Sequence, residues 1–306
     1  MKHVTIGIFH DTELGKQLAK KGTQSDIVLY NRKTDDGIYS FMEPVDDKFT
    51  VKSQIISEID AAIISFEQLT KQTGETIVLL DSFQISKGII ITKPYEDKDK
   101  IQHIIKDTAL QSYHIMEKDP IQIFEGIQQL TVQKQSDKDP IVMIDHAFSV
   151  KGVGEVILGV VKQGTIKKHD TLSLMPQKKN IIIRSIQMQD KDVDVAEAGS
   201  RVGCAIKGAT AEEMKRGSVL CTESAVHIAK KITASFQKNP YYENVTDGVF
   251  HVSVGMQTIP ATITVSNEKE LIIELEKEMV FTPNDLFIIL DLNAKKSRII
   301  GTAKTT

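Results

Sequence analysis

The spacing of hydrophobic and polar positions changes near residue 135. Before that point, short apolar runs alternate with longer segments of helical period. The pattern predicts strands over 3–9, 26–31, 37–42, 60–65, 88–92 and 113–116, and helices over 12–21, 51–58, 67–80, 97–110 and 120–132. Because parallel strands need crossover connections, this alternation predicts an α/β domain with a mainly parallel sheet.

After the polar segment 134–139, strands follow one another with little helix. They are predicted over 142–149, 155–162, 171–175, 181–189, 201–207, 228–236, 248–254, 260–265, 271–275, 286–290 and 297–303. Regular short strands with glycine-rich turns indicate closed antiparallel β-barrels. The span 132–306 is long for one small barrel, so we expect three domains: 1–133, 138–223 and 225–306.

Composition narrows the classes of protein that the chain can be. The 306 residues include 38 basic and 41 acidic side chains, a net charge of -3, and 41% are hydrophobic, which excludes a disordered chain and a wholly basic surface. Cys204 and Cys221 are too few for a disulfide framework or a structural zinc site and favour a reducing compartment. The chain starts without a long apolar run, and polar residues and Pro260 interrupt the uncharged stretch 248–267. We therefore expect a cytoplasmic protein without membrane partners.

Residues 144–221 contain the most specific motif. Its elements, in order, are Phe148, Val150, Gly152, Gly154, Val156, Gly159, Gly164, Asp170, Arg184-Ser185-Ile186, Ala198-Gly199, Val202-Gly203, Lys207-Gly208 and Arg216-Gly217. Each glycine alone also suits a tight barrel corner, but their joint spacing resembles the second domain of the translational GTPases, the elongation factor Tu and SelB superfamily. The last segment, ending in Ile299-Ile300-Gly301, is similar to the third barrel of that family, nearest the SelB type. The resemblance implies a P-loop GTPase-like α/β domain followed by two antiparallel barrels.

The phosphate loop that this resemblance implies is degraded. A working loop is G-x-x-x-x-G-K-[ST], in which backbone N–H groups hold phosphate, Lys neutralises it and Ser or Thr binds Mg²⁺. Residues 10–17 keep Gly15 and Lys16, but His10 stands at the first glycine position and Gln17 replaces the metal-binding hydroxyl. Asp11 and Glu13 would also repel a triphosphate.

The other motifs of the family are degraded as well. Its D-x-P-G-H becomes Met42-Glu43-Pro44-Val45-Asp46, and its N-K-x-D becomes Thr92-Lys93-Pro94-Tyr95. Only about four residues, 22–25, separate the first predicted helix from the next predicted strand, where the family has its long first switch. We therefore expect a pseudo-GTPase without catalytic residues, metal or cofactor, in which Gly15, Lys16 and Lys93 are a vestigial nucleotide site. The alternative is an active GTPase with atypical motifs, and only that alternative would bind GTP and Mg²⁺.

A cationic cluster favours RNA binding. Between residues 162 and 191, seven basic side chains face only Asp170 and Asp190. This is the charge pattern of a phosphate-backbone site, although an ordinary solvated barrel rim also explains it. Within this cluster we expect Lys167, Lys168 and Arg184 to contact RNA. The resemblance implies further RNA contacts at a pocket for the acceptor end of tRNA, formed by Val153, Gly154, Val156, Arg201 and Lys207. The resemblance implies tRNA or the ribosome, and not DNA, as partner. A protein-interaction module without RNA is a third alternative, and the oligomeric state stays open.

Overall fold

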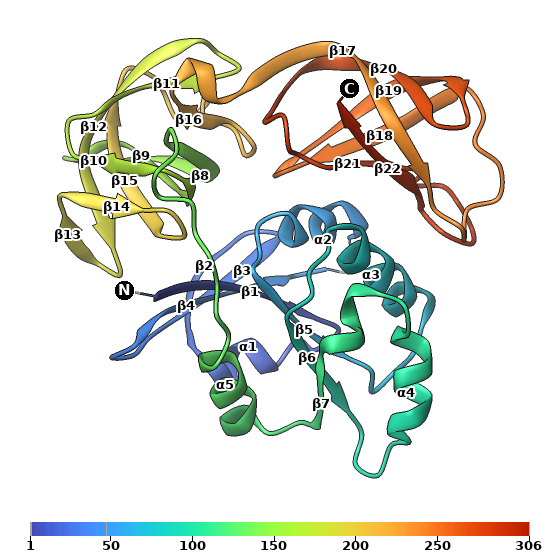
Figure 1. Ribbon diagram of the computed structural model, residues 1–306. Helices are drawn as coiled ribbons and strands as arrows, with labels where there is room; N and C mark the ends of the chain where they lie inside the picture. The colour runs from blue at the N-terminus through green and yellow to red at the C-terminus, as the bar shows by residue number, and fades with distance from the viewer. Residues whose placement is uncertain (1, 47, 306) are drawn as a thin grey trace. The chain divides into compact units, whose positions relative to one another are not determined.

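The structure is a computed structural model that describes residues 2–46 and 48–305, so Met1, Asp47 and Thr306 lie outside it. The chain divides into two compact units. The first contains residues 1–132, 239–243 and 291–300, and the second contains 133–238, 244–290 and 301–306. Figure 1 shows the α/β part of the first unit in blue to green and the barrel strands in green to red. Within the described residues, no helix is long and apolar enough to cross a membrane.

A seven-stranded sheet forms the centre of the first unit. Its strands are β1 (Lys2–Phe9), β2 (Lys20–Gln24), β3 (Ile27–Lys33), β4 (Gly37–Pro44), β5 (Ala61–Ser65), β6 (Gly88–Thr92) and β7 (His114–Glu117), in the order β2-β3-β4-β1-β5-β6-β7. The strands from β4 to β7 run parallel, and β2 and β3 add an antiparallel hairpin at one edge. This confirms the predicted mainly parallel sheet. The carboxyl ends of β1, β5, β6 and β7 therefore meet at one edge.

Five α-helices and a 3₁₀ turn accompany this sheet. They are α1 (Leu14–Leu18), α2 (Phe49–Ile56), α3 (Lys71–Ser82), α4 (Lys98–Ile105), η1 (Ala109–Ser112) and α5 (Pro120–Gln128). Side chains fix three of the helix starts. Thr70 forms a capping box with Thr73 at the start of α3, while Asp97 and Asp119 accept backbone N–H groups at the starts of α4 and α5. The predicted helix 97–110 was too long, because α4 ends at Ile105 and Asp107 has a left-handed backbone.

The prediction of a helix over 12–21 was wrong at its carboxyl end. The helix α1 has only five residues, and Ala19 is already extended, with φ -154° and ψ 165°. The chain then forms β2, in which Lys20 pairs with Asn31 and Lys21 with Tyr30. All five residues of β2 are exposed, so an edge strand of this kind leaves no alternation of apolar and polar residues in the sequence.

The second unit contains the two predicted barrels. The first is a closed ring of six strands, β11-β16-β8-β9-β15-β12, with β13 attached to β12. Its strands are β8 (Ile141–Val150), β9 (Gly154–Gln163), β11 (Thr171–Met175), β12 (Lys179–Met188), β13 (Lys191–Val193), β15 (Arg201–Lys207) and β16 (Val219–Cys221), and β10 (Thr165–Lys167) pairs with β14 (Val195–Glu197) beside it. Ile181 and Ile183 are buried in the barrel core while Ile182 and Arg184 point outward, as a period of two requires.

The second barrel closes in the order β17-β20-β19-β18-β21-β22. The short turn η2 (Glu223–Ala225) leads into its strands, which are β17 (His227–Lys238), β18 (Gly248–Val254), β19 (Gln257–Asn267), β20 (Glu270–Phe281), β21 (Phe287–Leu290) and β22 (Ile299–Thr305). Val280 of this barrel packs in one apolar cluster with Ile141, Val219 and Cys221 of the first barrel. Burial also raises the pKa of the Cys221 thiol to about 11, as expected for a structural cysteine.

Candidate functional site

Asp11 occupies the place where a phosphate loop would hold its anion. It follows β1 at the carboxyl edge of the first sheet, after His10, whose φ of 63° turns the chain. The Asp11 Oδ1 atom accepts the backbone N–H groups of Glu13 and Leu14, both at 3.1 Å, at the start of α1. Its Oδ2 atom lies 2.6 Å from the ammonium group of Lys118, which follows β7. The carboxylate is 7% exposed, so the donors that would face a phosphate are already paired inside the protein.

A second carboxylate lies against the same helix. Glu43, at the end of β4, is 5% exposed, and its Oε2 atom has no hydrogen-bond partner in the part of the chain that the structure describes. A Cβ atom on Gly15 would lie 2.7 Å from this oxygen and 2.4 Å from the ring of Tyr30. Gly15 therefore lets the helix approach Glu43 and Tyr30, and these side chains fill the space beside it.

Burial is the main reason why the pKa of Glu43 rises, to about 7. The nearby charges of Asp11 and Glu13 raise the pKa further, while a hydrogen bond with Tyr30 and the charge of Lys16 oppose the rise. Burial and the same carboxyl group raise the pKa of Tyr30 to about 12. The environment around Gly15 therefore disfavours negative charge, which is the opposite of what a triphosphate requires.

Two of the three residues predicted as a vestigial nucleotide site, Lys16 and Lys93, are exposed. Lys16 pairs with Glu13 at 3.0 Å on the surface of α1. Lys93 follows β6 and is exposed, and Tyr95, two residues later, is fully exposed. In the sheet, β5 lies between β6 and β1. The residues present do not fit GTP and Mg²⁺, because a carboxylate holds the helix N–H groups and Gln17 offers no metal-binding hydroxyl.

The first barrel contains a buried ionic cluster on β8 and β15. Asp145 is 6% exposed and accepts two hydrogen bonds from the Arg201 guanidinium, through Nη1 to Oδ2 and, at 3.2 Å, through Nη2 to Oδ1. The His146 Nδ1 atom lies 2.7 Å from the Asp145 Oδ1 atom, and Arg216 donates to the Asp145 carbonyl oxygen at 3.4 Å. Burial alone would raise the pKa of Asp145, but the Arg201 charge and the His146 hydrogen bond bring it below its usual value.

This cluster leaves one polar atom unsatisfied. The carboxylate of Asp145 orients the His146 ring through Nδ1, and the Nε2 atom on its other side is buried. No described residue bonds to this Nε2 atom. A buried ring nitrogen without a partner is energetically costly, so His146 is the unusual member of this cluster.

The predicted RNA contacts separate into groups. At the β8–β9 hairpin, the Arg184 Nη1 atom donates to the Val153 carbonyl oxygen at 3.3 Å, and Gly154 has a φ of 101°. Lys207 pairs with Ile182 on the outer face of the barrel, two residues before Arg184. Val156 lies within β9, opposite Ala205.

Two further predicted contacts lie at the end of β10 and in the turn that begins there, and a third lies apart from them. Lys167 and Lys168 are exposed there, and the next residues of the turn bond to β12 through Ile183. Arg201 is instead six residues before Lys207 on β15, roughly 20 Å away along the strand, and is bonded to Asp145. Arg201 and Lys207 thus lie at opposite ends of β15.

Comparisons with known proteins agree with the fold. The family described as Elongation factor Tu domain 2 matches residues 154–221. An uncharacterized protein of Methanocaldococcus jannaschii is 35% identical over 99% of this chain and all of its own length. The Selenocysteine-specific elongation factor of the same organism is 26% identical over 98% of this chain and 79% of its own. The chain belongs to the translational GTPase superfamily, as a SelB-like member.

A solved structure shows the same fold as this SelB-like protein. It is translation elongation factor SelB from Methanococcus maripaludis in complex with the GTP analogue GppNHp. The two share 23% identity with a TM-score of 0.86, over 100% of this chain and 79% of that one. This likeness concerns the fold of the α/β domain and of the two barrels.

Sequence reasoning missed three residues of these clusters. Asp145 and His146 lie within the segment 144–221 that identified the family. An acidic residue inside the apolar run 141–147 indicates a paired, buried carboxylate. Glu43 lies in the segment 42–46 that replaces the D-x-P-G-H motif of the family. No local pattern shows that it lies beside Gly15, because that contact depends on the parallel pairing of β1 with β4.

Proposed function

We propose that this SelB-like protein binds tRNA or the ribosome in the cytoplasm without a GTP-driven switch, and that it needs neither GTP nor Mg²⁺. The observation that supports the proposal most strongly is the Asp11 carboxylate on the N–H groups of α1, paired with Lys118. Two like charges 4 Å apart near a protein surface repel by about 4 kcal/mol. A triphosphate at α1 would meet Asp11, Glu13 and Glu43 together.

The first barrel supports the RNA part of the proposal. Arg184, Lys207 and Lys168 are exposed on or beside β12, and counterion release makes such groups effective for phosphate backbones. In this proposal they contact the RNA backbone, with Val153 beside Arg184.

The Asp145–His146–Arg201 cluster is the proposed contact for an aminoacylated tRNA end. Its buried Nε2 atom requires a hydrogen-bonding partner, and the Arg201 side chain is held in place by Asp145. One relative is named Selenocysteine-specific elongation factor, so selenocysteine is the aminoacyl group to test first.

The test is filter binding of charged and uncharged tRNA over a salt series from about 50 to 200 mM. Proposed RNA binding gives a steep fall of affinity with salt, and His146→Ala removes any preference for charged tRNA. Lys168→Ala should flatten the salt dependence, whereas Lys98→Ala on the exposed face of α4 is the charge-matched control and should not. A flat salt dependence in the wild type would favour the protein-interaction module. Micromolar binding of fluorescent GTP with guanine preference would favour the active GTPase.

A further inference from the structure

Glu75 is an almost fully buried carboxylate in the second turn of α3. Its side chain is 4% exposed, so it has lost most of its hydration. A carboxylate in this position requires several donors to offset the loss of water. They come from the segment Asp291–Ile300, which belongs to the same compact unit as α3.

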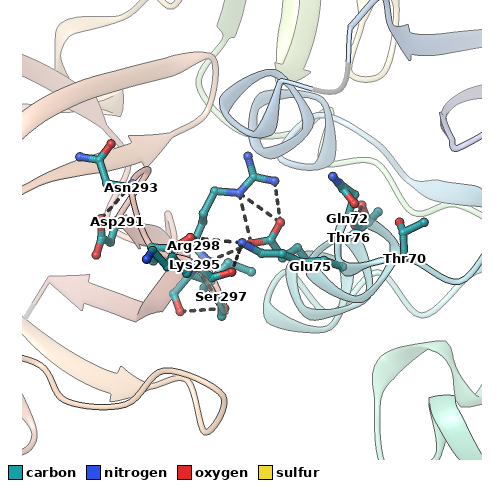
Figure 2. A network of polar contacts seen from close by, with 12 residues as sticks. Thr70, Gln72, Glu75, Thr76, Asp291, Asn293, Lys295, Ser297 and Arg298 are labelled. Carbon is teal, nitrogen blue, oxygen red and sulfur yellow. Dashed lines mark hydrogen bonds and ion pairs between the residues drawn. The ribbon is translucent and has the colours of Figure 1, made fainter.

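Arg298 supplies three donors to this one carboxylate. Its backbone N–H lies 2.9 Å from the Glu75 Oε1 atom, its Nε atom lies 3.1 Å from each carboxylate oxygen, and its Nη2 atom lies 2.5 Å from Oε2. Figure 2 shows the guanidinium facing the carboxylate in this forked arrangement. Paired charged hydrogen bonds of this kind fix both distance and direction.

Two further contacts join the same segment to α2 and α3. Lys71, one turn before Glu75, donates to the carbonyl oxygens of Ala294 at 3.2 Å and Lys295 at 2.6 Å. The Arg298 guanidinium lies 4.5 Å from the ring centre of Phe49, the first residue of α2. The segment therefore meets the start of each helix through a different side chain.

The segment is also tied to residues 239–243 of the first unit. Asn239 donates to the Ser297 hydroxyl at 3.2 Å and to the Ile299 carbonyl oxygen at 2.8 Å. The Tyr242 hydroxyl donates to Asp291 at 2.9 Å. Arg298 is thus presented to Glu75 by a segment that has its own hydrogen bonds.

We propose that the Glu75–Arg298 pair is a latch that holds α2 and α3 in one conformation whichever nucleotide is added. The reason lies in the position of α2, which follows the segment Met42–Asp46 where the family has D-x-P-G-H. Every contact described above is made by the protein's own side chains, so the helix starts are fixed without a phosphate. The latch does not depend on RNA binding.

Hydrogen exchange of the full chain tests the latch. In the wild type, amides of α2, α3 and residues 293–298 should exchange at the same rates with Mg-GTP, with Mg-GDP and without nucleotide. Arg298→Ala and Glu75→Gln should speed exchange at these amides by about tenfold or more, because each leaves a buried partner uncompensated, while α5 stays unchanged. Arg298→Lys keeps the charge without the fork and should give a smaller increase.

The matched control is Lys296→Ala in the same segment. Its ion pair with Glu243 at 2.5 Å is exposed on both sides, 78% and 71%, so its loss should leave exchange near the wild-type rate. The latch is overturned if Arg298→Ala behaves like Lys296→Ala, or if nucleotide alters exchange in α2 and α3 of the wild type. If Arg298→Ala does not fold, Arg298→Lys and Glu75→Gln provide the same comparison with Lys296→Ala.

Discussion

Glu43 lowers the stability of the first unit at neutral and higher pH, so Glu43→Gln should stabilise it there. Burial raises the pKa of Glu43 from 4.5 to about 7 in the folded protein. Between these values the folded state binds more protons than the unfolded state, so stability falls as the pH rises. Each pH unit between these two pKa values lowers the free energy of unfolding by about 1.4 kcal/mol. The loss is therefore roughly 3 kcal/mol above pH 7 and small near pH 4.5. Gln has the same shape and still accepts a hydrogen bond from Tyr30.

The assay is native-state hydrogen exchange of β1 and β4 amides, compared between variant and wild type at the same pH. At pH 8 the slowest amides of Glu43→Gln should exchange up to about a hundredfold more slowly, and at pH 4.5 the two proteins should differ little. Glu13→Gln is the control, because Glu13 is 62% exposed and its loss should change these rates by no more than about twofold. Faster exchange in Glu43→Gln at pH 8, or an equal effect at both pH values, would refute the reasoning.

Three other substitutions test other parts of the structure. Asp145→Asn should destabilise the first barrel by about 3 kcal/mol, because it leaves Arg201 buried without its carboxylate; thermal unfolding with no fall in Tm would contradict this. Arg184→Ala should lower the slope of log affinity against log salt for tRNA by about one, and an unchanged slope would show that Arg184 contacts no phosphate. Thr70→Ala removes the oxygen that accepts the Thr73 N–H and should cost about 1 kcal/mol in α3, measured by exchange of its first amides; unchanged rates there would refute the cap.

Periodicity predicted most of the fold because most of the strands have one buried face. In β12, Ile181 and Ile183 face the barrel core and Ile182 faces outward, which is the alternation that the sequence shows. The polar edge strand β2 has no buried face and was missed. The three-residue strand β16 was also missed, since all of its residues are buried and a run so short has no period.

The sites were less predictable than the fold because they depend on distant residues. Glu75 and Arg298 are 223 residues apart, and neither lies in a motif. Arg201 was expected with the outer basic residues, but its partner Asp145 is 56 residues away on a neighbouring part of the barrel. The loss of phosphate-loop residues was visible in the sequence. The pairing of Asp11 with Lys118 was not, because it depends on the sheet edge at which β1 and β7 both end.

The affinity of the wild-type protein for aminoacylated tRNA, measured with Mg-GTP, with Mg-GDP and without nucleotide, tests the account most directly. If the protein binds RNA without a nucleotide switch, the three dissociation constants agree within about twofold, well below the roughly 5–150-fold range of ordinary allosteric coupling. A difference of about tenfold or more between GTP and GDP, or no binding of tRNA under any of the three conditions, would contradict it.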